Sequence, residues 1–335
     1  MATTILGLDI GGANLKAATA DKRAISVPFP LWKQPDKLPT ALAELVAQFP
    51  DTEELAVTMT GELCDCFETK RDGVHAIVQA IEAVAACRVA RVWSTEGVFL
   101  NCEEAKHNHM KVAAANWHAL ATFAGRFAPN DGGLLLDIGS TTTDIVTLRD
   151  GAPRPIGKQD KQRLYFEELV YVGVLRTPVC AVYTDRVCAE LFATTQDAYA
   201  VLGLIPEDPD NRGTADGRPL TIDYSLARLA RMWGADRDTM TCDEITHFAS
   251  VIHKRLVERL AQSVRKVYFQ RWQPDTLRTV VLSGAGEFLA RSVIDAVLED
   301  SPAVQLVSLN DRLGPSVSAC APAYAVAVLA TERRP

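Results

Sequence analysis

Two aspartates, Asp9 and Asp137, occupy the same place in a repeated pattern: each ends an apolar run and is followed by Ile-Gly. Such a run predicts a buried strand, so each carboxylate would stand where a strand emerges. The glycines and small hydroxyl residues that follow permit a tight reversal whose N–H groups can face an oxyanion, and carboxylates can hold Mg²⁺ through water. The repeat therefore predicts a phosphate-binding site built from two halves.

The groups expected to bind phosphate are backbone amides, hydroxyls and one lysine. They follow the two aspartates and are Gly11, Gly12, Asn14, Lys16, Gly139, Ser140, Thr141, Thr142 and Thr143. A third turn lies between a strand pattern at 279–282 and a helix pattern at 288–298. Strand, glycine turn and helix in that order bring amide donors and a positive dipole end together. We therefore expect this turn to contact phosphate through Ser283, Gly284, Ala285 and Gly286.

Simpler interpretations of the same residues remain open. Each aspartate could cap its own turn by accepting nearby N–H groups, as Asp commonly does. Lys16 could be a solvated strand residue. Neither copy is a Walker loop or a dinucleotide fingerprint, because the glycine spacing of those motifs is absent after both strands.

Apolar periodicity indicates the elements that would position these turns. In the first half, strand patterns lie at 5–9, 15–19, 55–59 and 89–93, and helix patterns at 38–49 and 74–86. A long amphipathic helix pattern over 113–127 precedes the second aspartate strand, which is followed by a strand pattern at 145–148. After an exposed loop at 206–219, helix patterns follow at 222–233, 242–272, 288–298 and 321–331. Such alternation favours an α/β fold of mixed sheets covered by helices.

Composition limits the function. At 335 residues the chain is long enough for about two domains. A net charge of −7 argues against nucleic acid or an anionic membrane as the main partner, and no apolar run is long enough to span a bilayer. The N-terminus enters a strand pattern at once instead of a leader, so we expect a cytoplasmic protein. Oligomeric state cannot be read from the sequence.

Together the two Asp-Ile-Gly turns, the helix pattern before the second and the late Ser-Gly-Ala-Gly turn resemble the superfamily of actin, sugar kinases and the Hsp70 ATPase domain. The resemblance covers the whole chain. It implies a two-lobed, actin-like (ribonuclease H-like) α/β fold with duplicated mixed sheets. The first lobe would comprise residues 1–110 plus 317–335 and the second residues 111–316, with the two closing on a phosphate-bearing ligand.

Within that superfamily the chain resembles the hydantoinase/oxoprolinase-related group, and in it the enzymes of methanofuran biosynthesis. The strings that carry this closer match are Thr58 to Phe67, Ala115-Asn116-Trp117, Gly139 to Asp144, and Tyr171 to Pro178. The resemblance implies a diphosphate-displacing ether synthase of one-carbon carrier biosynthesis. Its substrates would be a furanylmethyl diphosphate and γ-glutamyltyramine, whose phenol oxygen displaces diphosphate to form an aryl ether.

That chemistry suggests roles for the remaining polar residues. Asp9 and Asp137 would position Mg²⁺, while Glu62 or Asp65 would accept the phenol proton, because a phenol with a pKa near 10 needs help to attack at neutral pH. Arg176 could bind the glutamyl carboxylate as a fork, and Asp144 could bond the loop or the metal. The residues expected to bind substrate are Thr60, Asn116, Asp144, Tyr171, Arg176 and Thr177. A polar loop around Glu62 and an ordinary surface arginine at 176 are the simpler interpretations.

Two rival functions use the same parts. An ATP-dependent kinase or ATPase of this fold would place Ser283 to Gly286 on the nucleotide, since a clamp for diphosphate also suits ATP phosphates. A non-enzymatic, actin-like scaffold would bind nucleotide only to set its shape. Nucleotide turnover would favour the first rival, and concentration-dependent filaments the second.

Overall fold

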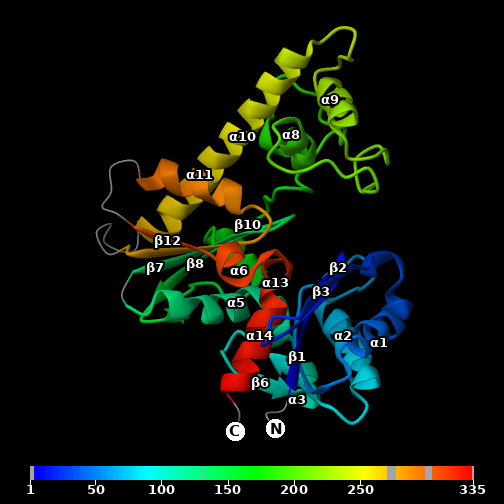
Figure 1. Cartoon of the computed structure of the whole chain (residues 1–335), viewed down its shortest axis with the longest axis vertical. Coiled ribbons are helices and arrows are strands. Elements are labelled where there is room, and N and C mark those ends of the chain that lie inside the picture. The colour runs from blue at the N-terminus through cyan, green and yellow to red at the C-terminus, as the bar shows by residue number, and fades with distance from the viewer. Residues whose placement is uncertain (1–3, 131, 270–276, 299–303, 334–335) are drawn as a thin grey trace.

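The computed structural model describes residues 4–130, 132–269, 277–298 and 304–333, which form two mixed β-sheets with helices around and between them (Figure 1). The first sheet has the order β3-β2-β1-β4-β5-β6. Its strands are β1 (Thr4–Ile10), β2 (Asn14–Thr19), β3 (Ala24–Pro28), β4 (Thr52–Met59), β5 (Val89–Trp93) and β6 (Phe99–Asn101).

The second sheet repeats the arrangement of the first around its aspartate strand. Its order is β10-β8-β7-β11-β12, with β9 paired to β8. Its strands are β7 (Gly133–Ile138), β8 (Thr143–Arg149), β9 (Ala152–Pro153), β10 (Leu169–Val170), β11 (Thr279–Ser283) and β12 (Gln305–Ser308). In both sheets the aspartate strand pairs antiparallel with the next strand and parallel with a later one, β4 or β11. The sequence repeat is therefore a repeat of topology.

Both faces of the first sheet are covered, which explains why β1 is a continuous apolar run. Leu6, Leu8 and Ile10 pack in one core with α1 (Leu38–Ala47) and α2 (Lys70–Ala85). Ile5 faces the opposite side, in a core shared with α5 (Asn116–Ala124) and α14 (Ala321–Glu332). Because successive side chains of a strand point to opposite faces of the sheet, β1 contributes to two separate cores.

Helices α5 and α14 form a layer between the two sheets (Figure 1). The core that contains them also includes Leu135, Val146 and Leu148 of the second sheet. The expected amphipathic helix over 113–127 is therefore wrong in two respects: α5 begins at Asn116, and almost every residue in it is buried, because sheets lie on both sides. The end of the pattern, Gly125–Phe127, is a 3₁₀ turn.

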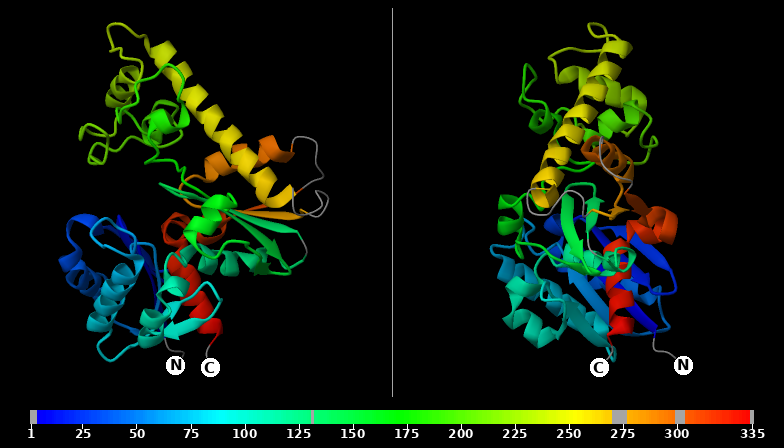
Figure 2. Two further views of the ribbon diagram at one scale, coloured as in Figure 1. Left: turned by 180° about the vertical axis from the view of Figure 1, so that it is seen from behind. Right: turned by 90° about the vertical axis from the view of Figure 1, so that its left-hand side faces the viewer.

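The second sheet's outer face packs against α10 (Cys242–Val264) and α11 (Glu287–Leu298). The N-terminal end of α10 extends beyond the sheet. Together with α8 (Thr195–Val201) and α9 (Ile222–Arg231) it forms a part that projects away from both sheets (Figure 2). The long helix pattern over 242–272 becomes a π-helix at Arg265–Phe269, and 270–272 lies outside the described residues. The shorter helices are α3 (Cys102–His107), α4 (His109–Val112), α6 (Asp160–Tyr165), α7 (Val179–Val182), α12 (Leu309–Leu313) and α13 (Pro315–Ala319).

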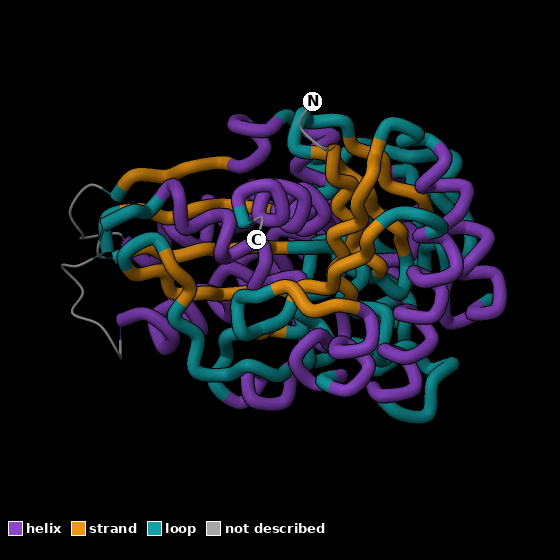
Figure 3. Tube along the Cα trace, turned by 90° about the horizontal axis from the view of Figure 1, so that it is seen from below, coloured by secondary structure: helices purple, strands orange, loops and turns teal. Residues whose placement is uncertain are grey.

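The α/β prediction with duplicated mixed sheets is confirmed, and seen from below the strands of the two sheets form separate groups (Figure 3). Helix α14 packs on β1, β2 and β4 of the first sheet, as the expected first lobe requires, but the lobe boundaries themselves stay a prediction. Both ends of the described chain lie at the same end of the molecule (Figure 2). Across the described part of the chain, the helices are too short or too polar to cross a membrane.

The contact between β1 and α14 predicts that Gly7→Ala is strongly destabilising. A Cβ at Gly7 would lie 1.9 Å from the Ala323 carbonyl oxygen, so the C-terminal helix must move away from the sheet. We expect a loss of about 3 kcal/mol in the free energy of unfolding, measured by urea denaturation. Gly213→Ala, on an exposed loop, is the matched control. Equal stability of the two variants would contradict the close packing.

Candidate active site

The two glycine turns have the same internal closure. The Gly11 N–H donates to the Asn14 carbonyl oxygen at 3.0 Å, and the Gly139 N–H donates to the Thr142 carbonyl oxygen at 2.9 Å. These two amides are therefore committed to their own turns. Within the described residues, the amides of Gly12, Ser140 and Thr141 have no acceptor, so they are the donors that each turn can offer to an anion.

The first turn is held by segments that follow other strands. The N–H groups of Thr60 and Gly61, just after β4, both donate to the Ile10 carbonyl oxygen, at 2.9 and 3.0 Å. The Leu31 N–H donates to the Gly12 carbonyl oxygen at 2.9 Å. The Thr60-Gly61 segment therefore fixes the end of β1, which gives the Thr58–Phe67 string a positioning role.

The second turn is held by the Tyr171–Pro178 segment. The Val174 N–H donates to the Gly139 carbonyl oxygen at 3.0 Å, and the Arg176 N–H donates to that of Ser140 at 2.9 Å. A Cβ at Gly173 would lie 2.5 Å from the Thr141 nitrogen, so only glycine allows this approach. The loop therefore wraps closely around the turn.

Two threonines of the expected set use their hydroxyl groups inside this wrapping. The Thr143 hydroxyl donates to the Val172 carbonyl oxygen at 2.7 Å, and the Thr177 hydroxyl accepts from the Gly173 N–H at 2.9 Å. Both side chains are buried. Their polar groups therefore hold the loop rather than point to solvent.

The two aspartates lie at equivalent strand ends. Asp9 faces Lys16 across the β1–β2 pair, and Asp137 faces Asp144 across the β7–β8 pair. Burial raises the pKa of Asp9, and the Lys16 ammonium lowers it. The pKa of Asp137 is raised to about 7, mainly by burial and also by Asp144, against the lowering effects of the Ser283 hydroxyl and Lys16. The Lys16 ammonium therefore lowers the pKa of both carboxyls.

The third glycine turn packs directly on the end of β7. Gly284 has a φ of +89°, and a Cβ there would lie 2.2 Å from the Ile138 carbonyl oxygen and 2.7 Å from Asp137 Oδ1. The Gly286 N–H donates to the Ile138 carbonyl oxygen at 2.8 Å. The expected phosphate residues Ser283 to Gly286 therefore lie beside Asp137, although the Gly286 amide is already committed.

Glu62 is buried at the boundary between the lobes. Its Oε1 lies 3.9 Å from Lys70 Nζ. Lys70 also forms a 2.6 Å ion pair with Asp160, which belongs to the expected second lobe. Burial raises the pKa of Glu62 to about 7, with its own N–H and Lys70 lowering it and Asp160 raising it. A carboxyl in this state exchanges a proton near neutral pH. Asp65, by contrast, is exposed.

Asp144 is held by an arginine that the sequence did not point to. Arg163 Nη1 donates to Asp144 Oδ1 at 2.7 Å, and the guanidinium lies 3.8 Å from the centre of the Trp117 ring. Burial raises the pKa of Asp144, and Arg163 lowers it. Asn116 is the first residue of α5 and precedes this tryptophan. Asp144 therefore belongs to a buried ion pair at the lobe boundary.

An aromatic ring and a cation meet across the lobes beside the two turns. Trp32 follows Leu31, which is bonded to the first turn, and Arg176 is bonded to the second. The Arg176 guanidinium lies 5.6 Å from the centre of the Trp32 ring, and the indole is 37% exposed. The pair therefore spans the region between the turns. Tyr171, with 66% of its side chain exposed, makes no such contact in the described part of the chain.

Unsatisfied buried polar atoms gather at this boundary. Buried polar atoms are normally hydrogen-bonded, so a cluster without partners indicates a place for ligand or water. Among the described residues, the atoms of the site that lack a partner are Asp9 Oδ1, Thr58 Oγ1, Glu62 Oε2, Trp117 Nε1, Arg163 Nε and Ser283 Oγ. They lie on both lobes. Four residues join the site from positions with no local sequence signal, namely Trp32, Lys70, Asp160 and Arg163, whereas Trp117 belongs to the Ala115-Asn116-Trp117 string.

Asp9 and Asp137 suit a hydrated Mg²⁺ ion better than a metal held by protein alone. Asp9 Oδ1 is buried without a partner, and no group of three or more His, Cys, Asp or Glu that could hold a metal occurs in the part of the chain that the structure describes. Mg²⁺ commonly takes one or two carboxylates and completes its shell with water and phosphate oxygens. The donor set therefore fits this ion in the presence of a phosphorylated ligand.

The burial of Glu62 predicts that Glu62→Gln stabilises the protein at alkaline pH. The folded chain keeps a proton on Glu62 up to about pH 7, whereas the unfolded chain loses it near 4.5, so the wild type loses stability as pH rises through this window. We expect the variant to gain up to about 3 kcal/mol at pH 8 and little at pH 4. Urea unfolding at both pH values measures this, with Asp65→Asn as the control. A variant less stable than wild type at pH 8 would contradict it.

Comparison with known proteins identifies the family of this chain. Residues 53–333 match the family model described as hydantoinase/oxoprolinase. A relative from Methanocaldococcus jannaschii, 35% identical over 341 residues and 98% of both chains, is named (4-{4-[2-(gamma-L-glutamylamino)ethyl]phenoxymethyl}furan-2-yl)methanamine synthase. A protein of the same name from Methanococcus vannielii is 32% identical over 204 residues, covering 58% of this chain and 89% of the relative.

Two solved structures share the fold at low identity. A nucleotide-free acetone carboxylase superimposes with a TM-score of 0.55 and 11% identity, over 98% of this chain and 70% of that one. The PilM–PilN complex of type IV pilus biogenesis gives 0.53 and 15%, over 99% of this chain and 100% of that one. These likenesses concern the fold alone. With its full-length relative and a family match over most of its residues, the chain belongs to the hydantoinase/oxoprolinase family.

Proposed function

We propose that this protein is a transferase that joins a phenol to a furanylmethyl group as an aryl ether. The observation that carries the proposal is the pair of matched glycine turns, each preceded by an aspartate at its strand end, with Trp32 and Arg176 meeting beside them. The full-length relative adds the chemistry, because its printed product contains a phenoxymethyl group on a furan ring. We infer that the ether bond of that product is the bond that this chain forms.

The proposed reaction uses a furanylmethyl diphosphate and γ-glutamyltyramine. The carbon–oxygen bond to the diphosphate breaks, and its electron pair leaves with the diphosphate. The phenol oxygen forms a new bond to the same carbon and loses its proton. Because charge builds up on the leaving group, the chain's main task is to stabilise an anion.

The two turns supply that stabilisation. The amides of Gly12, Ser140 and Thr141, which have no acceptor among the described residues, can donate to an anion, and Lys16 adds a positive charge opposite Asp9. Asp9 and Asp137 would hold Mg²⁺, which when bound supplies further positive charge to the diphosphate oxygens. Each lobe contributes one turn, so substrate binding would also hold the lobes together.

Glu62 is the proposed general base, in preference to the exposed Asp65. Its Oε2 is buried without a partner and can accept the phenol proton, and the Lys70 ammonium 3.9 Å from Oε1 stabilises the carboxylate form. Arg176 remains the proposed fork for the glutamyl carboxylate, next to the second turn. Trp32 beneath it would cover the reacting carbon and exclude water, which would otherwise trap a ring-stabilised cation as an alcohol.

The decisive experiment is to incubate the purified protein with the furanylmethyl diphosphate, γ-glutamyltyramine and Mg²⁺ and to detect the ether by mass. Product together with one equivalent of released diphosphate supports the proposal. A second candidate, an ATP-dependent kinase, is favoured by the Gly284 turn against Asp137. It predicts phosphate release from ATP and no ether, so nucleotide turnover in the same assay separates the two.

Asp9→Asn and Asp137→Asn should each lower kcat at least about a hundredfold, because each removes one negative charge that would hold the Mg²⁺ needed to stabilise the leaving group. Steady-state kinetics at saturating substrates measures this. Asp185→Asn, an exposed carboxylate far along the chain, should retain wild-type turnover. Full activity of either active-site variant, with native circular dichroism, would remove that aspartate from the mechanism.

The pH profile should report Glu62. A base must be deprotonated, so kcat/KM should rise with pH and level off above about 7, the pKa to which burial raises this carboxyl. Glu62→Gln should lose this inflection and fall in rate by about a hundredfold or more. A ring-fluorinated acceptor, whose phenol is more acidic, should recover part of the rate. A Glu62→Gln profile identical to that of Asp65→Asn would contradict the role.

A further inference from the structure

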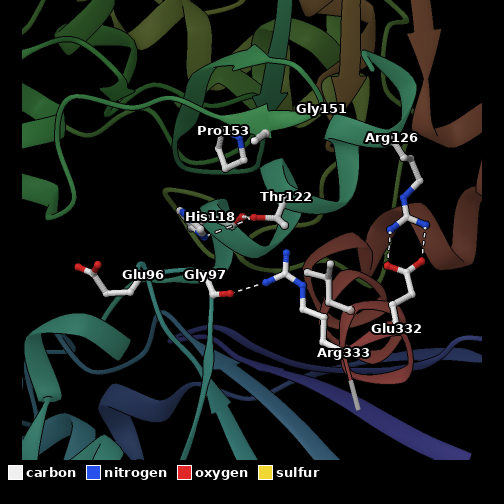
Figure 4. Close-up of a pocket in the computed structure, with 11 residues that line it drawn as sticks. Glu96, Gly97, His118, Thr122, Arg126, Gly151, Pro153, Glu332 and Arg333 are labelled. Atoms are coloured by element: carbon white, nitrogen blue, oxygen red, sulfur yellow. Dashed lines mark hydrogen bonds and ion pairs between the residues drawn. The ribbon is translucent and has the colours of Figure 1, made fainter. Parts of the chain in front are cut away.

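A separate cavity lies at the far end of the layer between the sheets (Figure 4). Its volume is about 570 Å³, within the range of small-ligand sites. Its walls come from the β5–β6 turn, from α5 and the 3₁₀ turn after it, from the β8–β9 turn and from the end of α14. Both sheets therefore contribute. The cavity lies at the C-terminal end of α14, whereas Cys320, which is near Asp9 and Lys16, precedes the other end of this helix. The twelve residues of α14 place the two about 18 Å apart.

His118 presents a hydrogen-bond donor to this cavity. The side chain lines the wall and is only 8% exposed. Its Nδ1 accepts a hydrogen bond from Trp93 Nε1 at 3.3 Å, so the ring proton of a neutral imidazole resides on Nε2. Among the described residues no acceptor is bonded to Nε2. Burial, followed by Arg333, Lys158 and Arg163, lowers the pKa of His118 to about 4, so the Nε2–H donor persists at neutral pH.

The charges around the cavity leave one cation without a carboxylate. Arg126 forms a two-pronged ion pair with Glu332 at 3.0 and 3.2 Å, and Lys158 pairs with Glu96 at 3.0 Å (Figure 4). Arg333 instead donates to the Gly97 carbonyl oxygen and lies 5.1 Å from the centre of the Trp93 ring. In the described part of the chain it has no carboxylate partner. The cavity thus offers a positive charge and an N–H donor close together.

We propose that this cavity binds a small organic carboxylate, whose oxygens contact Arg333 and the Nε2–H of His118. The apolar part of the ligand rests on Ala152, Pro153 and Leu329. An arginine and a neutral N–H donor recognise a carboxylate by charge and by hydrogen bonding at once. Because both sheets line the cavity, an occupant contacts the two lobes on the side away from the aspartates.

The test uses benzoate as the probe and benzamide, its neutral equivalent of nearly the same shape, as the matched ligand. In protein labelled with ¹⁵N-histidine, benzoate should shift the His118 Nε2 resonance in a saturable manner, and benzamide should bind at least about tenfold more weakly. The resonance is assigned by its loss in His118→Gln.

Variants locate the ligand. Arg333→Gln, an exposed position at a helix end, should weaken benzoate binding at least tenfold and leave folding intact. Arg312→Gln, an exposed arginine on another helix, and Asp137→Asn should bind benzoate as the wild type does. Equal binding of benzoate and benzamide, or undiminished benzoate binding in Arg333→Gln, would overturn the proposal.

Discussion

The burial of two carboxylates that are both influenced by one lysine is the constraint on which the structure depends. A carboxylate removed from water carries a large cost unless a cation or hydrogen-bond donors compensate it. Here burial raises the pKa of Asp9 and Asp137, and Lys16 relieves only part of the cost for each. The chain holds this arrangement because every surrounding element is fixed by packing or by backbone hydrogen bonds. Positive charge from a ligand or a metal ion would therefore stabilise the two carboxylates further.

Close backbone contacts hold the segments around the two aspartates in place, despite the cost of removing the carboxylates from water. The glycines at 7, 173 and 284 each lie where a Cβ would overlap a backbone atom of another segment. Three segments distant in the sequence can therefore approach the aspartate strands more closely than side chains would allow. The two lobes are also joined by ion pairs such as Lys70–Asp160, so their relation is fixed by side chains as well as by the central helices.

Much of the fold could be predicted from the sequence because its signals are local. Continuous apolar runs predict the strands β1, β4, β7 and β11. The two aspartates lie near the ends of β1 and β7. The backbone of the Tyr171–Pro178 segment bonds to the Gly139–Ser140 turn instead of to a long strand ladder, so it has no strand or helix period to read. The pairings Lys70–Asp160, Arg163–Asp144 and Trp32–Arg176 join residues from separate elements. Nothing in their spacing reveals such partners, since only the tertiary structure brings them together.

The position of α14 has a consequence for the order in which the protein is made. This helix comes last in the described chain, yet it covers the face of the first sheet that carries Ile5 and Ala18. During translation the N-terminal sheet leaves the ribosome without this helix on that apolar face, because α14 is made only after some three hundred further residues. Nascent chains therefore pass through a long period in which chaperones can bind this surface.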